Sequence, residues 1–167
     1  MKVFIEEQKF TQPLVIVGLS LAFIIVSIST YSTWDKISSG SIGQQFGALS
    51  GLIIITLVSL LFLKLKLKTR IDERGVQYQF YPFQFNSKII VWNSISVCKI
   101  RNYSAISEFG GWGMKRRIYG KGRCYTTKGN IGLQIELKNG KQFLIGTQKK
   151  DELQRTLDNY KYKITNG

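Results

Sequence analysis

The sequence predicts an α+β protein: an N-terminal two-helix transmembrane hairpin, then an antiparallel β-barrel or sandwich with a C-terminal α-helix. Three patterns lead to this fold class. The first is a run of eighteen residues without a charge, 46–63, followed by closely spaced lysines. The second is a two-residue alternation of apolar and polar side chains directly after this run. The third is a helical repeat of apolar residues near the C-terminus.

The uncharged run is long enough to cross a bilayer. At about 1.5 Å per residue it covers roughly 27 Å, close to the thickness of the hydrocarbon layer. An earlier apolar segment begins at Pro13, whose missing N–H costs nothing at a helix start, and it ends near Tyr31 and Trp34. The predicted hairpin covers 13–65, with spans at about 13–34 and 44–64.

Closely spaced cations at the end of the second span predict its orientation. Such residues remain preferentially on the cytoplasmic side of a membrane. Both termini and the soluble domain, 66–167, are therefore expected in the cytoplasm beside an inner membrane, with residues 1–12 as a separate segment at the interface. The membrane-proximal basic cluster consists of Lys64, Lys66, Lys68 and Arg70.

Each span carries two small residues four apart, a spacing that lets helix backbones approach closely. The pairs are Gly18 with Ala22 and Gly47 with Gly51. In an antiparallel hairpin they lie at opposite depths, so they do not face each other. They pack either within the hairpin, against Ser59 and Ser27 respectively, or against another partner, which is a second copy of the chain or a different membrane protein.

The excess positive charge lies entirely in the soluble part. The formal net charge is +14, and residues 64–167 contain 21 basic and 7 acidic side chains. A basic surface beside an anionic leaflet suggests contact with lipid headgroups. Nucleic acid is the rival partner, since aromatic residues such as Tyr119 and Tyr125 lie near basic ones.

The residue types argue against an enzyme. The chain has no histidine, and its two cysteines, Cys98 and Cys124, have no CxxC spacing. This excludes imidazole-based triads and histidine-containing zinc sites, so we expect no catalytic residue, no metal and no cofactor. The two cysteines are interpreted as small apolar side chains in strands.

The soluble domain begins as a strand in which Leu65, Leu67, Thr69 and Ile71 share one face. Further strands are predicted at 76–83, 87–92 and 95–103. A hairpin at 131–146 has Asn139-Gly140 as a type I′ turn. Near the C-terminus, Leu153, Leu157 and Tyr160 predict a short amphipathic helix, followed by a loose tail over 161–167.

A glycine-rich stretch, 110–123, interrupts the strand pattern and carries the candidate contact residues. It holds Trp112 with Lys115, Arg116, Arg117, Lys121 and Arg123. One interpretation is a loop that brings the indole to the headgroup level and the cations to phosphates. The other is a bend in the barrel wall with Trp112 packed inward.

Several runs resemble a group of small bacterial membrane proteins with pleckstrin-homology-like domains. They are TRIDERGVQYQFYPF, the W-x-x-I pattern from Trp92 to Ile95, EFGGWGMKR and GLQIELKNGKQFLIGTQ. The N-terminal EEQKF segment and the paired spans resemble this group as well. The resemblance implies a bent sheet closed by the C-terminal helix, and it brings neither an enzyme activity nor a ligand.

Two functions follow from the sequence. The first is a non-enzymatic, membrane-anchored module for protein interaction, scaffolding or lipid-headgroup recognition at the inner leaflet. The second is a nucleic-acid-binding domain tethered to the membrane. Basic residues near the lysines that follow the second span favour the first, and a distant basic groove with exposed aromatic rings favours the second.

Overall fold

The computed structural model describes residues 3–118 and 122–165, and it divides the chain into two compact units. One unit is a helical hairpin, Thr11–Lys64. The other is a β domain that combines Met1–Phe10 with Leu65–Gly167. The mixed α+β class is confirmed, since two long apolar helices accompany two β-sheets and a C-terminal helix.

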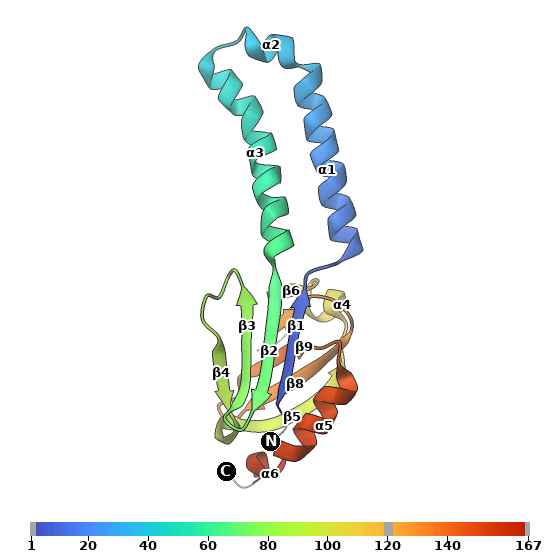
Figure 1. Ribbon diagram of the computed structural model, residues 1–167, viewed down its shortest axis with the longest axis vertical. Coiled ribbons are helices and arrows are strands. Elements are labelled where there is room, and N and C mark those ends of the chain that lie inside the picture. Colours follow the sequence, from blue (N-terminus) through green and yellow to red (C-terminus); the bar gives the residue numbers. More distant parts are fainter. Residues whose placement is uncertain (1–2, 119–121, 166–167) are drawn as a thin grey trace. The chain divides into compact units, whose positions relative to one another are not determined.

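The hairpin unit contains two helices that are long and apolar enough to cross a membrane. Figure 1 shows α1 and α3 side by side, and Pro13 begins the first helix as predicted. A short additional helix, α2, lies between them in the sequence. The helices are α1 (Pro13–Ser32), α2 (Trp34–Ser38) and α3 (Ile42–Lys64).

Hydroxyl groups within these helices bond to their own backbone. The Ser27, Thr30 and Ser59 hydroxyls each donate to the carbonyl four residues earlier, at 2.8–2.9 Å. A hydroxyl that is satisfied in this way needs no water, which suits an apolar environment.

The prediction of a separate N-terminal segment is wrong, because residues 4–9 form the first strand of the β domain. Strand β1 (Phe4–Lys9) pairs antiparallel with β2 (Lys66–Asp72), and Phe4 lies opposite Ile71. The helical hairpin is therefore inserted in the sequence between two neighbouring strands of one sheet.

The nine strands of the described residues form two open sheets rather than a closed barrel. Sheet A has the order β1-β2-β3-β4, and sheet B has the order β5-β8-β9-β7-β6. The strand bounds are β3 (Gly75–Tyr81), β4 (Lys88–Val91), β5 (Ile95–Asn102), β6 (Gly113–Arg116), β7 (Arg123–Thr126), β8 (Ile131–Leu137) and β9 (Gln142–Gly146). The prediction of a wholly antiparallel arrangement is wrong, because β7 and β9 run parallel.

The predicted alternation in sheet A is confirmed. Leu67, Ile71 and Val76 are fully buried, while Lys68 and Arg70 are exposed between the first two. The rings of Tyr78 on β3 and Tyr125 on β7 have centroids 4.6 Å apart, so the two sheets share a core. A short 3-10 helix, η1 (Trp92–Ser94), links sheet A to sheet B.

The β8–β9 turn differs from the predicted type I′ turn. Among the described residues only glycines have positive φ, so Asn139 does not adopt the conformation that this turn requires. Instead Gly140 (φ 78°) donates its N–H to Leu137 O, and Leu137 N donates to Lys141 O. This pattern is the three-residue connection with glycine at the left-handed position.

The C-terminal helix α5 (Lys150–Tyr160) buries Leu153, Leu157 and Tyr160, as predicted. The Tyr160 ring stacks on Trp92 with centroids 5.5 Å apart, so the helix packs beside η1. The expected loose tail instead contains a further short helix, α6 (Tyr162–Thr165).

Candidate functional site

The first group of candidate cations lies on the outward face of strand β2. We call Lys66, Lys68 and Arg70 the β2 cations. Strand β1 brings Glu7 opposite Lys68, and the carboxylate of Glu7 accepts from Lys66 Nζ at 3.2 Å and lies 3.3 Å from Lys68 Nζ. The hydrogen bond from Lys66 holds the pKa of Glu7 below its usual value. One acid of β1 therefore partly neutralises two cations of β2.

Arg70 also has an acidic partner. Its Nε donates to Asp72 Oδ2 at 3.0 Å, and the same oxygen accepts from Gln77 Nε2 at 2.9 Å. Burial raises the pKa of Asp72, but hydrogen bonds from Arg74 N and Arg70 outweigh this effect, so the pKa lies below its usual value. Each of the β2 cations thus has an acid within the β domain, whereas Lys64 is the last residue of α3.

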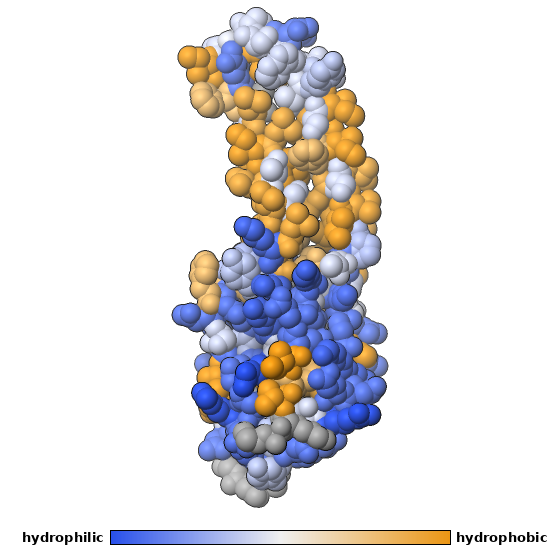
Figure 2. All heavy atoms as spheres, in the orientation of Figure 1, coloured by the Kyte–Doolittle hydropathy of each residue, from blue (hydrophilic) through white to orange (hydrophobic). Residues whose placement is uncertain are grey.

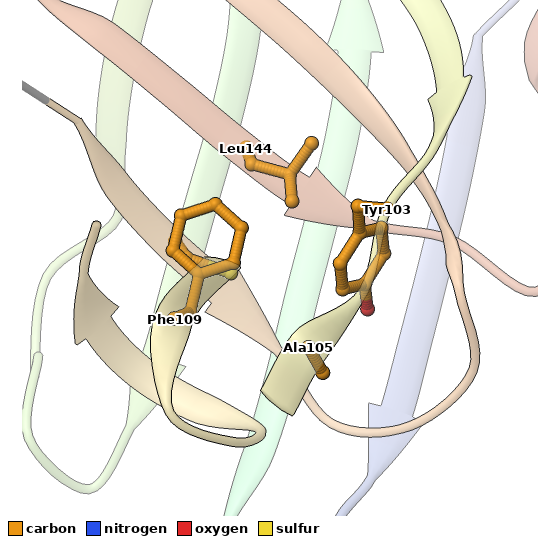
Figure 3. Packing of buried hydrophobic residues seen from close by; sticks show 5 residues of the cluster. Tyr103, Ala105, Phe109 and Leu144 are labelled. Carbon is orange, nitrogen blue, oxygen red and sulfur yellow. The ribbon is translucent and has the colours of Figure 1, made fainter. Parts of the chain in front are cut away.

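Part of the glycine-rich stretch forms strand β6 (Gly113–Arg116). Its first residues and the helix before it pack over sheet B. Helix α4 (Ala105–Phe109) ends at Gly110, whose φ of 70° suits glycine, and β6 follows. Figure 3 shows Phe109, Ala105 and Tyr103 gathered around Leu144, and Trp112 packs against this cluster. The indole N–H of Trp112 donates to Gly129 O at 2.9 Å.

The position of Trp112 supports the inward-packed interpretation. Its ring is partly buried against a small core, and its polar atom is already bonded within the domain. A tryptophan that anchors a domain at a lipid interface instead places its ring among the headgroups and its N–H in the wet layer. We therefore assign Trp112 to packing.

Two arginines beside this cover share one carboxylate. Arg101 donates to both oxygens of Glu108, at 2.9 and 2.7 Å, and Arg117 lies 4.0 Å from the same group. The hydrogen bond from Arg101 holds the pKa of Glu108 below its usual value. Of the predicted contact residues, Arg117 is thus engaged in an ion pair.

The remaining candidates have a different environment. We call Lys115, Arg116 and Arg123 the β6–β7 cations; all three are exposed. Arg116 lies directly opposite Arg123 in the β6–β7 ladder. No ion pair is recorded for the β6–β7 cations among residues 3–118 and 122–165. Lys121 lies outside the described residues.

A shallow depression adjoins Arg123. It has a volume of about 200 Å³, and Lys141, Gln142, Phe143 and Gly122 complete its lining. Two cations and a side-chain amide at one hollow form a set of donors that suits an anionic oxygen group. Like charges directly opposite each other in a ladder are unfavourable, so an anion near Arg116 and Arg123 would relieve their repulsion.

Of the two tyrosines that the sequence places near basic residues, the described one is not available for base stacking. Tyr125, which the sequence associates with base stacking, is buried between the sheets. Tyr119 lies outside the described residues. The structure thus removes one aromatic residue from the nucleic-acid interpretation.

The small residues of the helices differ in their surroundings. A Cβ added at Gly51 would lie 3.5 Å from Val26 Cγ1 of α1, so this glycine packs within the hairpin. Added Cβ atoms at Gly18 and Gly47 meet nothing within 4 Å. Packing of these two glycines within the hairpin is therefore not observed, and their use by a second copy stays a prediction.

Both cysteines lie in strands of sheet B, as expected for small apolar side chains. Burial raises the pKa of each thiol, Cys98 and Cys124, to about 12. A thiolate is therefore scarce at neutral pH, which disfavours nucleophilic chemistry. Within the described part of the chain, no cluster of three metal-binding side chains occurs.

Two features were missed by the sequence analysis. Glu6 and Gln8 point inward from β1, where Glu6 accepts from Thr147 Oγ1 at 2.7 Å and Gln8 Nε2 donates to Gly146 O at 2.7 Å. These bonds join β1 to the end of β9. The alternation of Phe4, Glu6 and Gln8 is the available signal, but two of its three inward residues are polar.

In the comparisons with known proteins, no family model and no curated protein matches the chain.

Proposed function

We propose that the protein is a non-enzymatic, membrane-anchored module that recognises anionic lipid headgroups at the inner leaflet of a bacterial membrane. The observation that carries this proposal is the insertion of two long apolar helices between β1 and β2 of one sheet. Two chain connections join the β domain to the hairpin, and a double connection limits rotation of a domain more than a single flexible linker does.

The exposed β6–β7 cations support the headgroup assignment. They are exposed, and two of them face each other across a ladder without a recorded acid among the described residues. Basic side chains attract anionic lipid by about 1 kcal/mol each near a membrane surface. Recognition of a protein partner at the same cations is the alternative within this class.

We further propose a pleckstrin-homology-like fold for the β domain and a cytoplasmic location for it. The two sheets and the C-terminal helix α5 support a pleckstrin-homology-like domain, although the parallel β7–β9 pair is an addition to that layout. The lysine that ends α3 supports a cytoplasmic location for the β domain and both termini.

Cysteine labelling in intact cells tests the anchorage. A cysteine at Ser39, which lies exposed after α2, should react with a membrane-impermeant maleimide added outside. A cysteine at Lys138, exposed in the β8–β9 turn, should react only after permeabilisation. The wild type is the control for Cys98 and Cys124, whose raised pKa values of about 12 make the reactive thiolate scarce at neutral pH. Labelling of Lys138→Cys alone from outside would contradict the orientation.

A further inference from the structure

In the loop between β3 and β4, a polar side chain is buried and its apolar neighbours are exposed. Gln84 is buried, with 9% of its surface exposed, whereas its neighbours Phe83 and Phe85 are 55% and 79% exposed. Figure 2 shows an orange protrusion where Figure 1 draws this loop. A loop surrounded by water would more readily bury the rings and expose the amide. The arrangement therefore suggests an apolar environment outside the domain.

Hydrogen bonds hold the loop in this conformation. Gln84 N donates to Phe80 O at 2.9 Å, and Gln84 Oε1 accepts from Phe80 N at 3.2 Å. From β3, the side-chain amide of Gln79 donates to Phe85 O at 2.6 Å. The buried glutamine thus replaces backbone pairing at the end of the strand. The two rings are presented outward by a fixed backbone, which lowers the ordering entropy lost on insertion.

The loop lies at the end of sheet A from which both connections to the hairpin leave. Lys9, Lys66 and Tyr81 form one row across β1, β2 and β3, and Tyr81 directly precedes the loop. Lys66 follows Lys64, the last residue of α3, by two residues. Two residues of extended chain reach about 7 Å at most. The row from which the loop begins is therefore bound covalently close to the end of a predicted span.

Neighbouring side chains complete a surface that suits a lipid interface. Exposed Met114 of β6 contacts the loop, with its sulfur 3.8 Å from Gln84 Nε2. Lys66 Nζ lies 5.9 Å from the centre of the Tyr81 ring. Aromatic rings and long cationic side chains are the residues that favour the headgroup region of a bilayer.

On the basis of the membrane anchorage proposed above, we propose that Phe83 and Phe85 insert into the interfacial layer of the membrane that the hairpin spans. The occupant of this surface is lipid, because the short connection from α3 brings the row of Tyr81 to the bilayer. Inserted rings would fix the β domain against the leaflet and so limit the orientations in which the β6–β7 cations meet headgroups.

The test uses the full chain in lipid vesicles, with single cysteines that carry an environment-sensitive fluorophore. The positions are Phe83→Cys and Phe85→Cys in the loop, with two controls. Val91→Cys is the matched control, since Val91 is 46% exposed on β4 but lies opposite Gly75, at the other end of sheet A. This end is about 20 Å from Tyr81 along the strand. Leu57→Cys, exposed in the middle of α3, reports whether the span lies in lipid.

Lipids with a nitroxide on the acyl chain should quench the fluorophore at 83, 85 and 57, with no loss of emission at 91. Quenching at 57 without quenching at 83 and 85 overturns the insertion and leaves the anchorage intact. Blue-shifted but unquenched emission at 83 and 85 also overturns it, since protein would then cover the loop. Equal quenching at 91 overturns the insertion as well, because lipid contact would then not be specific to the loop. No quenching at 57 overturns the anchorage itself.

Discussion

The β2 cations and the β6–β7 cations look alike along the chain, but their surroundings differ. Both groups lie on strands, and all their members except the partly buried Lys66 are exposed. Glu7 of the neighbouring strand pairs with Lys66 and Lys68, whereas the strand opposite Arg116 supplies another arginine. Glu7 lies 59 residues from Lys66 in the sequence. The comparison shows that the density of cations along a sequence does not identify which of them are free to bind an anion.

The largest expected effect on stability follows from removal of strand β1, which carries Glu7. A fragment of residues 68–167 lacks β1 and the first residues of β2, so we expect no cooperative unfolding. Loss of the fully buried Phe4 side chain alone costs about 3–5 kcal/mol, against a total stability of about 5–15 kcal/mol. The measurement is near-UV circular dichroism during thermal unfolding.

The control is a second fragment that retains β1 but lacks helices α1, α2 and α3. Phe10 N donates to Leu65 O at 3.1 Å, so the two ends lie close enough for a short glycine-serine linker. Residues 1–10 joined in this way to 65–167 should fold. A cooperative transition in the fragment 68–167 would contradict the role assigned to β1.

A smaller effect on stability is expected when Glu108, which pairs with Arg101 and Arg117, is replaced. Glu108→Gln should lower the free energy of unfolding at pH 7 by about 1–3 kcal/mol, because Arg101 loses a charged, bidentate acceptor. The pKa of Glu108 is lower in the folded protein than its usual value of 4.5. Its contribution is therefore complete above 4.5 and is lost as the pH falls through the folded-state pKa.

Thermal unfolding in detergent at several pH values measures this dependence. The melting temperatures of wild type and Glu108→Gln should converge as the pH falls below 4.5. Glu136→Gln is the control, since Glu136 of β8 has no recorded ion pair in the described part of the chain. A difference that is constant from neutral to acidic pH would contradict the assigned ion pair.

The smallest effect on stability is expected at Glu7. Glu7→Gln should cost less than about 1 kcal/mol, because its ion pairs are exposed. The change frees Lys66 and Lys68, so the β2 face should retain more anionic lipid than in the wild type. Glu73→Gln, in the turn before β3, is a control with the same charge change. Equal retention in the two variants would show that the pairing of the β2 cations has no influence.

The sequence predicted the two long apolar helices and most strands because each rests on a local pattern. The alternation around Leu67 and Ile71 and the helical spacing of Leu153 and Leu157 need no distant partner to be recognised. Strand β1 was missed because two of its three inward side chains, Glu6 and Gln8, are polar. Their partners, Thr147 and Gly146 at the end of β9, are brought near only by the folded chain.

The candidate contact residues were predicted as one group, and the structure separates them. Trp112 and Arg117 are engaged inside the domain, while Arg116 and Arg123 remain exposed. Sequence spacing cannot make this division, because it depends on the fold of α4 over sheet B. The outward orientation of the Phe83 and Phe85 rings likewise becomes visible only in the folded chain, where Gln84 is buried between them.

Retention of anionic phospholipid by the purified full chain tests most directly whether the β6–β7 cations bind headgroups. The test compares Arg116→Gln/Arg123→Gln with Lys66→Gln/Lys68→Gln, which removes the same charge from paired positions. At about 1 kcal/mol per cation, native mass spectrometry in mild detergent should show about a fivefold weaker retention for each arginine removed. The lysine variant should lose clearly less retention, because Glu7 partly neutralises Lys66 and Lys68. An equal loss in both variants would contradict the account.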